Sequence, residues 1–419
     1  MKISIPGIVF IVGGLLGHAG LHAQSNSSPY SILGIGDLED NMYNRTSGMA
    51  NTGIAYRNSQ YLINNNPASY AVLANQLFIA ELGGRGRLIN YSGSDINSTN
   101  NKTKDFAIRR LSLGMRLTKW WGSSAGLMPF STANYNFYGT KYIQGTQMST
   151  PATYEGSGGV NQVYWANGFK ITKNLSVGIN SSLLWGSLQQ KETLTSTDLA
   201  TSLATQKNIY LINTYFNYGA QYFARLNKKW DLGLGVTYAA PRDLKAQYTA
   251  TITSGTGTQI SNNIIKNDFF QLPANFGGGL TLTRNKSLTI AADYKYANWS
   301  STHYQGMDYQ LVNSNRISAG VESSKKVTYY NTSVEKIYWQ MGAYYSNSYL
   351  QVYGRQLQDR GVTVGLGVNS KRSTLGYHIG LNYGILGSRA NGLIRENYFA
   401  INLSFSYREI WETRGKKYF

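Results

Sequence analysis

Few side chains in this chain of 419 residues have the chemistry that catalysis or metal binding requires. Cysteine is absent, which excludes disulfides, thiol nucleophiles and thiolate metal ligands. Two of the four histidines, His18 and His22, fall in an N-terminal apolar stretch. The other two, His303 and His378, lie far apart and match no pattern for a metal site or a nucleophile–base pair. We therefore expect no enzyme activity, no catalytic residue, no metal and no cofactor.

Two further features raise the question of phosphate or nucleic acid. The pair Gly34 and Gly36 could belong to a phosphate-binding loop, but no preceding strand, following helix or Lys-Ser/Thr pair accompanies it. The net charge is +19, yet the basic residues are scattered and many fall in tight turns. We expect no nucleic-acid partner and interpret the basic loops as facing an anionic membrane surface.

Residues 1–23 have the pattern of a secretory signal peptide. Lys2 gives the positive end, an apolar run follows it, and Ala23 closes a cleavage site before Gln24. An uncleaved anchor helix is the alternative, but the apolar run is short for one. The pattern predicts export from the cytoplasm.

Beyond about residue 75, apolar residues recur at every second position. Side chains alternate sides along a strand, so each such segment has one apolar and one polar face. These segments run nine or more residues, near the length that crosses a bilayer at a tilt. The clearest apolar faces are those of residues Trp230, Leu232, Leu234, Val236 and Tyr238, and of residues Phe399, Ile401, Leu403, Phe405 and Tyr407. Together they predict an all-β, transmembrane antiparallel barrel in the outer membrane of a Gram-negative-type bacterium.

The connections predict the strand number and the orientation. Five short basic turns separate the strand patterns, at residues 118–120, 172–174, 227–229, 284–286 and 370–372, and a sixth lies between Ser323 and Lys336. Between them are longer polar stretches, such as residues 90–104, 139–159 and 189–208, which we interpret as loops. Short turns face the periplasm in bacterial barrels. The count predicts about fourteen strands.

Residues 24–75 do not alternate. They are rich in Gly and Asn turns, yet contain too much Tyr, Met, Ile and Leu for a disordered tail. A barrel of this size encloses more space than side chains fill. We therefore expect three parts: a signal peptide at 1–23, an N-terminal hatch or plug in the lumen at 24–75, and the barrel at 76–419.

Pro129 lies inside the third predicted strand, followed by Phe130. Proline cannot donate to a strand ladder, so it indicates an edge, bulge or break. A break in a closed barrel is an opening in the wall, and we predict a lateral opening at Pro129 and Phe130. The alternative is a proline above the bilayer, near a loop.

Several short motifs resemble the FadL/TodX family of outer-membrane transporters of hydrophobic compounds. They are Gly48-Met49-Ala50 with Gly53, Asn66-Pro67-Ala68 before the first strand, Leu272-Pro273 followed by glycines, and the closing Glu396-Asn397-Tyr398-Phe399. The resemblance spans nearly the whole mature chain and implies a fourteen-stranded barrel with a hatch. It also implies a ligand path at Gly48, Met49, Asn66, Pro67 and Ala68.

The first functional hypothesis is passive uptake of hydrophobic small molecules, such as long-chain fatty acids, through a lateral opening. Basic residues expected on loops, among them Arg85, Arg87, Arg109 and Arg110, would attract a carboxylate head group. The alternative is a non-transporting barrel subunit of a larger outer-membrane complex for secretion or barrel assembly. Expected partners are therefore a hydrophobic ligand, outer-membrane lipid and lipopolysaccharide, and outer-membrane proteins.

Overall fold

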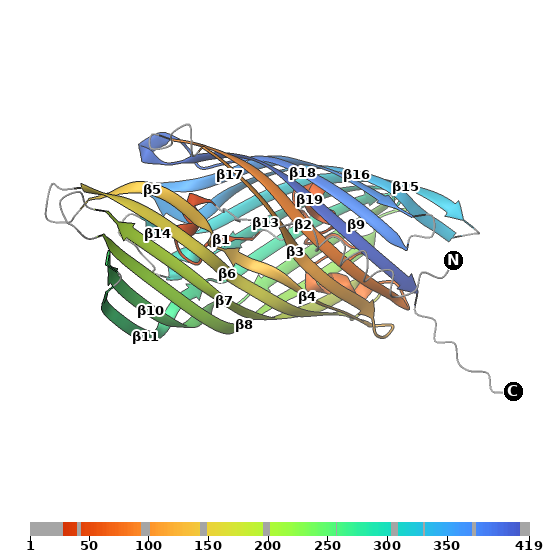
Figure 1. The fold of residues 1–419 in the computed structure, drawn as a ribbon. Coiled ribbons are helices and arrows are strands. Elements are labelled where there is room, and N and C mark those ends of the chain that lie inside the picture. Colours follow the sequence, from red (N-terminus) through yellow and green to blue (C-terminus); the bar gives the residue numbers. More distant parts are fainter. Residues whose placement is uncertain are drawn as a thin grey trace, which may run out of the picture.

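The computed structural model describes residues 28–39, 43–93, 101–142, 149–195, 202–256, 258–302, 309–329, 332–370 and 374–410. The predicted signal peptide lies outside these residues. Antiparallel strands dominate the described chain and close into a barrel (Figure 1). In the described part of the chain, no helix is long and apolar enough to cross a bilayer.

The barrel wall has fourteen strands, the number expected from the turns. Four of them are broken into two halves each: β4 with β5, β9 with β10, β11 with β12, and β14 with β15. The barrel closes where β19 pairs with β2, from Arg395 opposite Ser92 to Ile410 opposite Leu77. The strands are β2 (Leu77–Ser92), β3 (Lys102–Arg116), β4 (Trp121–Thr132), β5 (Tyr135–Tyr142), β6 (Ser149–Lys170), β7 (Leu175–Leu194), β8 (Leu203–Arg225), β9 (Trp230–Ala239), β10 (Arg242–Ser254), β11 (Gln259–Leu272), β12 (Asn275–Arg284), β13 (Leu288–Ala297), β14 (Tyr309–Leu311), β15 (Ser314–Tyr329), β16 (Thr332–Val352), β17 (Arg355–Asn369), β18 (Leu375–Leu386) and β19 (Arg395–Ile410).

The alternation predicted from the sequence sets which side chains face outward. In β19, Phe399, Ile401 and Leu403 are exposed on the outside, whereas Ala400 and Asn402 between them are buried. A closed ladder leaves no sheet edge toward lipid, so a wall with an apolar outer face is stable there.

The short turns lie at one end of the barrel, as predicted. The turn between β12 and β13 places Asn285 and Lys286 at φ 51° and 55°, and the Ser287 amide donates to the Arg284 carbonyl, the geometry of a tight turn with two left-handed central residues. The prediction of long loops at the other end is partly wrong. Most of residues 139–159 and 189–208 belong to β5, β6, β7 and β8, which continue past the apolar band. Strands that leave the membrane have polar residues on both faces, so the alternation disappears while the ladder persists.

The described residues of the N-terminal segment, 28–39 and 43–76, contain only short elements. They are the 3₁₀ turns η1 (Pro29–Ile32), η2 (Arg45–Met49) and η3 (Pro67–Val72) and the two-residue strand β1 (Asp37–Leu38). Asn44 and Asn66 cap η2 and η3 by accepting the amide hydrogens of Thr46 and Ala68. Figure 1 shows this segment, in red and orange, among the strands of the barrel. A further 3₁₀ turn, η4 (Trp299–Thr302), follows β13, and η5 (Ala390–Gly392) precedes β19.

Candidate functional site

The turn η2 rests directly on glycines of the barrel wall. Gly48 lies so close to β17 that a Cβ added to it would come within 2.5 Å of the Gly365 Cα. Its carbonyl accepts a hydrogen bond of 2.8 Å from the Thr363 hydroxyl. Met49 is fully buried, and a Cβ on Gly342 of β16 would lie 2.5 Å from its backbone. Gly48 and Met49 thus contact the wall, and their predicted role in a ligand path stays a prediction.

The turn η3 is seated in the same way on the other side of the lumen. The side-chain amide of Asn66 donates to the carbonyls of Ile54, Ala220 and Val236, at 2.9, 3.1 and 3.2 Å. It thereby joins the segment to β8 and β9. Pro67 and Ala68 lie against Gly178 of β7, where a Cβ would be 2.4 Å from the Pro67 carbonyl carbon. These three residues from the predicted path also contact the wall.

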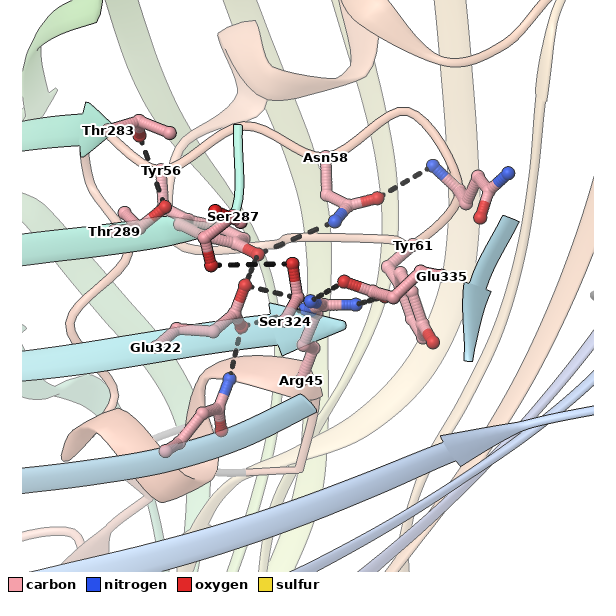
Figure 2. Close-up of polar contacts among 12 residues, drawn as sticks. Arg45, Tyr56, Asn58, Tyr61, Thr283, Ser287, Thr289, Glu322, Ser324 and Glu335 are labelled. Carbon is pink, nitrogen blue, oxygen red and sulfur yellow. Dashed lines mark hydrogen bonds and ion pairs between the residues drawn. The ribbon is translucent and has the colours of Figure 1, made fainter. Parts of the chain in front are cut away.

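A buried ion network, the Arg45 cluster, fixes η2 to β15 and β16 (Figure 2). Arg45 donates to Glu322 at 2.8 Å and to Glu335 at 2.5 Å, and its side chain is 1% exposed. The Tyr338 ring lies 3.7 Å from the guanidinium carbon, and Tyr56 donates to Glu322. Because burial alone would lower the pKa of Arg45, it is the two carboxylates that raise this pKa above its ordinary value. The guanidinium is therefore held charged by both partners.

A second ion network, the Glu39 cluster, lies between β1 and the strands β2 and β3. Glu39 accepts from Arg85 at 3.1 Å and from Arg109 at 3.2 Å, and its side chain is 3% exposed. Arg109 also contacts Asp105, at 3.0 Å. Burial raises the pKa of Glu39, but the guanidiniums of Arg85 and Arg109 lower it by more, so this pKa lies below its ordinary value. Glu39 is therefore ionised inside the barrel.

These positions correct the expectation that the four arginines lie on loops. Arg85 and Arg87 belong to β2, and Arg109 and Arg110 belong to β3. Arg110 pairs with Glu81 at 3.0 Å and donates to the Leu62 carbonyl at 2.9 Å. The prediction of loop positions was wrong because inward-facing strand positions are also polar. Polarity alone does not distinguish a lumen-facing strand from a loop.

The hydrogen-bond ladder between β3 and β4 stops short of Pro129, and the lateral opening predicted at Pro129 and Phe130 stays a prediction. The β3–β4 ladder ends at Leu111 opposite Leu127. On the other side of β4, the register with β6 shifts between Pro129 and Ser131. Beyond this interruption, β1 pairs with the end of β4, and the Glu39 amide donates to the Phe130 carbonyl at 3.0 Å. β1 thus pairs with the part of β4 that β3 leaves unpaired, next to the Glu39 cluster.

One polar pair was not predicted from the sequence. The Ser47 hydroxyl lies 2.7 Å from Nε2 of His378, which belongs to β18. Both side chains are buried, and Nδ1 of His378 has no hydrogen-bond partner among the described residues. The contact thus joins η2 to β18 of the wall. The residues are 331 positions apart, and no spacing rule connects them.

No group of three or more His, Cys, Asp or Glu side chains placed to hold a metal occurs in the part of the chain that the structure describes.

The fold is that of the outer-membrane transporters of hydrophobic compounds. The Ralstonia pickettii toluene transporter TbuX superposes with a TM-score of 0.57 at 15% identity, over 87% of this chain and 97% of its own. The Pseudomonas putida toluene transporter TodX superposes with a TM-score of 0.57 at 19% identity, over 90% of this chain and 100% of its own. A Pseudomonas aeruginosa FadL homologue superposes with a TM-score of 0.56 at 12% identity, over 88% of this chain and 98% of its own. At these identities the similarity shows the fold alone.

The sequence model of the BamG family matches residues 5–418. The chain therefore belongs to the BamG family, and its resemblance to FadL and TodX holds at the level of the barrel. No curated protein matches the sequence.

Proposed function

We propose that this chain is a non-transporting barrel subunit of an outer-membrane protein complex, of the barrel-assembly type that the name BamG suggests. The observation that carries the proposal is the attachment of the N-terminal segment to the wall by buried charges. The Arg45 cluster holds it to β15 and β16, and the Glu39 cluster holds it to β2 and β3. Breaking one partner of a buried ion pair costs about 3–5 kcal/mol, so a segment held at several such points acts as a fixed plug.

The charged side chains beside the interrupted β3–β4 ladder support the same proposal. An apolar molecule that left the lumen between β3 and β4 would pass Glu39, Arg85 and Arg109, which are buried and charged. Contact with an apolar ligand would replace the partners of these charges, and unpaired buried charge is strongly unfavourable. We therefore infer that apolar molecules do not leave the barrel between β3 and β4.

Affinity purification from the native outer membrane tests the proposal. A tagged chain, extracted in mild detergent, is expected to bring down other outer-membrane proteins at a fixed ratio. Recovery of the chain alone, with or without prior cross-linking in the membrane, contradicts the proposal.

Passive uptake of hydrophobic molecules is the second candidate, and the interrupted ladder beyond Leu127 is the observation that favours it. In this case β1 acts as a gate. A Glu39→Gln variant loosens that gate, so saturable uptake of a long-chain fatty acid into reconstituted vesicles should increase. Equal, background uptake by the native chain and the variant opposes this candidate.

A further inference from the structure

A second interruption of the wall lies on the far side of β8. This strand pairs with β10 through Leu211 and with β9 from Asn217 onward. Residues 212–216 have no ladder partner on that side, because β9 ends at Ala239 and residues 242–245 of β10 pair with β11 but not with β8. Pro241 stands in the break and has no N–H to donate. The three strands β8, β10 and β11 run side by side in Figure 1.

The interruption forms a cavity of about 560 Å³, here called the wall notch. Its lining consists of Leu183, Ile212, Asn213, Thr214, Pro241, Arg242, Asp243 and Lys245. Leu183 and Ile212 are outward-facing and exposed, whereas Leu211 and Leu244 beside them are buried in the lumen. The notch therefore opens on the outer surface of the barrel.

Hydrogen bonds hold one side of the wall notch in place, and two cationic side chains line the notch without forming an ion pair to any described residue. The Asn213 side chain donates to the Lys245 carbonyl and accepts from the Lys245 amide, both at 3.1 Å. Arg242 donates to the Thr214 hydroxyl at 3.2 Å, which fixes its side chain over the notch. Within the described chain, neither the Arg242 guanidinium nor the Lys245 ammonium forms an ion pair. Asp243 instead accepts from Gln271, at 2.7 Å.

The wall notch lies at the level of the barrel where we expect the lipid head groups of the membrane. Outward positions of β8 are aromatic or apolar from Tyr222 to Tyr210, except for Thr214 in the notch itself, and turn polar at Asn208 and Gln206. Tyrosines at such a boundary mark the membrane interface. The notch, at Ile212 and Thr214, lies next to the boundary on the side away from the short turns.

We propose that the wall notch binds the phosphate group of an outer-membrane lipid, with its acyl chains along the apolar wall. A guanidinium and an ammonium bind phosphate oxygens, and basic pockets at the interface bind anionic head groups. Leu183 and Ile212 continue into the lipid-facing surface of the barrel, so the ligand is a lipid rather than a free anion. This inference does not rest on the proposed function and gives the expected lipid partner a defined site.

Native mass spectrometry of the detergent-solubilised full chain tests the proposal, with bis-phosphorylated lipid A as the probe. The test variant is R242Q/K245Q, and the matched control is K228Q/K229Q, which removes the same charge from the exposed β8–β9 turn. Retained folding of each variant is checked by its heat-dependent mobility on a gel. The native chain and the control should bind one lipid A, and the test variant should bind it at least tenfold more weakly.

Two further probes identify the ligand. Lipid A without its phosphates should bind the native chain as weakly as bis-phosphorylated lipid A binds the test variant. Inorganic phosphate at millimolar concentration should not displace the lipid. Equal binding by R242Q/K245Q and the native chain overturns the site, and displacement by inorganic phosphate alone overturns the assignment to a lipid.

Discussion

Arg45 is the residue on which the attachment of the N-terminal segment depends most. Its guanidinium contacts two buried carboxylates and the Tyr338 ring, from strands that are nearly 300 positions away. A lone arginine in a polar stretch looks like a surface residue, and nothing near it in the sequence marks Glu322 or Glu335 as partners. Such a cluster becomes visible only when the barrel closes.

Replacing Arg45 by alanine leaves Glu322 and Glu335 buried without their cation. We expect the free energy of unfolding in detergent to fall by about 3–5 kcal/mol. The exposed pair Lys141–Glu192 is the control, since Lys141→Ala should cost about 0.2–1 kcal/mol. Urea unfolding followed by tryptophan fluorescence measures both, and equal effects would contradict the role of the Arg45 cluster.

Glu39 makes the Glu39 cluster sensitive to acid. Its pKa in the folded chain lies below the ordinary value of 4.5. The ionised carboxylate therefore contributes stability at pH values above 4.5, and the contribution is lost as the pH falls through the folded pKa. The difference in free energy of unfolding between the native chain and Glu39→Gln should be constant between about pH 6 and 8 and shrink below about pH 4. A difference independent of pH would contradict the ionised state.

At the scale of elements, glycines on the inner face of the wall decide where the segment rests. Gly178 of β7 touches η3, and Gly342 of β16 touches η2. Gly278 of β12 is the matched contrast, because a Cβ there would meet no atom within 4 Å. The backbone of the segment packs against the wall at glycines, where the wall has no side chains.

A Gly178→Val substitution should therefore displace η3 while the barrel stays closed. Overpacking of this kind costs about 1–3 kcal/mol, which corresponds to about 5- to 150-fold more of the displaced segment. Limited proteolysis of the segment should accelerate in that range in Gly178→Val and stay unchanged in Gly278→Val. Identical proteolysis of the two variants would show that η3 is not seated on β7.

The sequence predicted the elements of the wall better than the contacts of the segment. Alternation in β19 and the turn at Asn285 and Lys286 are local, so they can be read without a structure. The failure at residues 139–159 and 189–208 has a physical cause, because strands outside the bilayer no longer need an apolar face. Contacts such as Ser47–His378 depend on which wall position faces the segment, and this register is set by the whole barrel.

At the scale of the whole molecule, the barrel combines the fold of the toluene transporters with an N-terminal segment bound to the wall at several points. One of these points is an apolar cluster away from the short turns, where Ile35 of the segment packs with Leu184 and Phe270. The Arg45 cluster and the Glu39 cluster attach the segment to other parts of the wall. Membership in the BamG family and these attachments of the segment both favour the proposed subunit of an assembly.

Uptake of toluene and of a long-chain fatty acid by reconstituted vesicles tests this account most directly. Vesicles with the purified native chain are compared with empty vesicles and with vesicles that contain the toluene transporter TodX. The account predicts uptake of either compound equal to that of empty vesicles, while TodX vesicles take up toluene. Saturable uptake of either compound above that of empty vesicles would contradict the account.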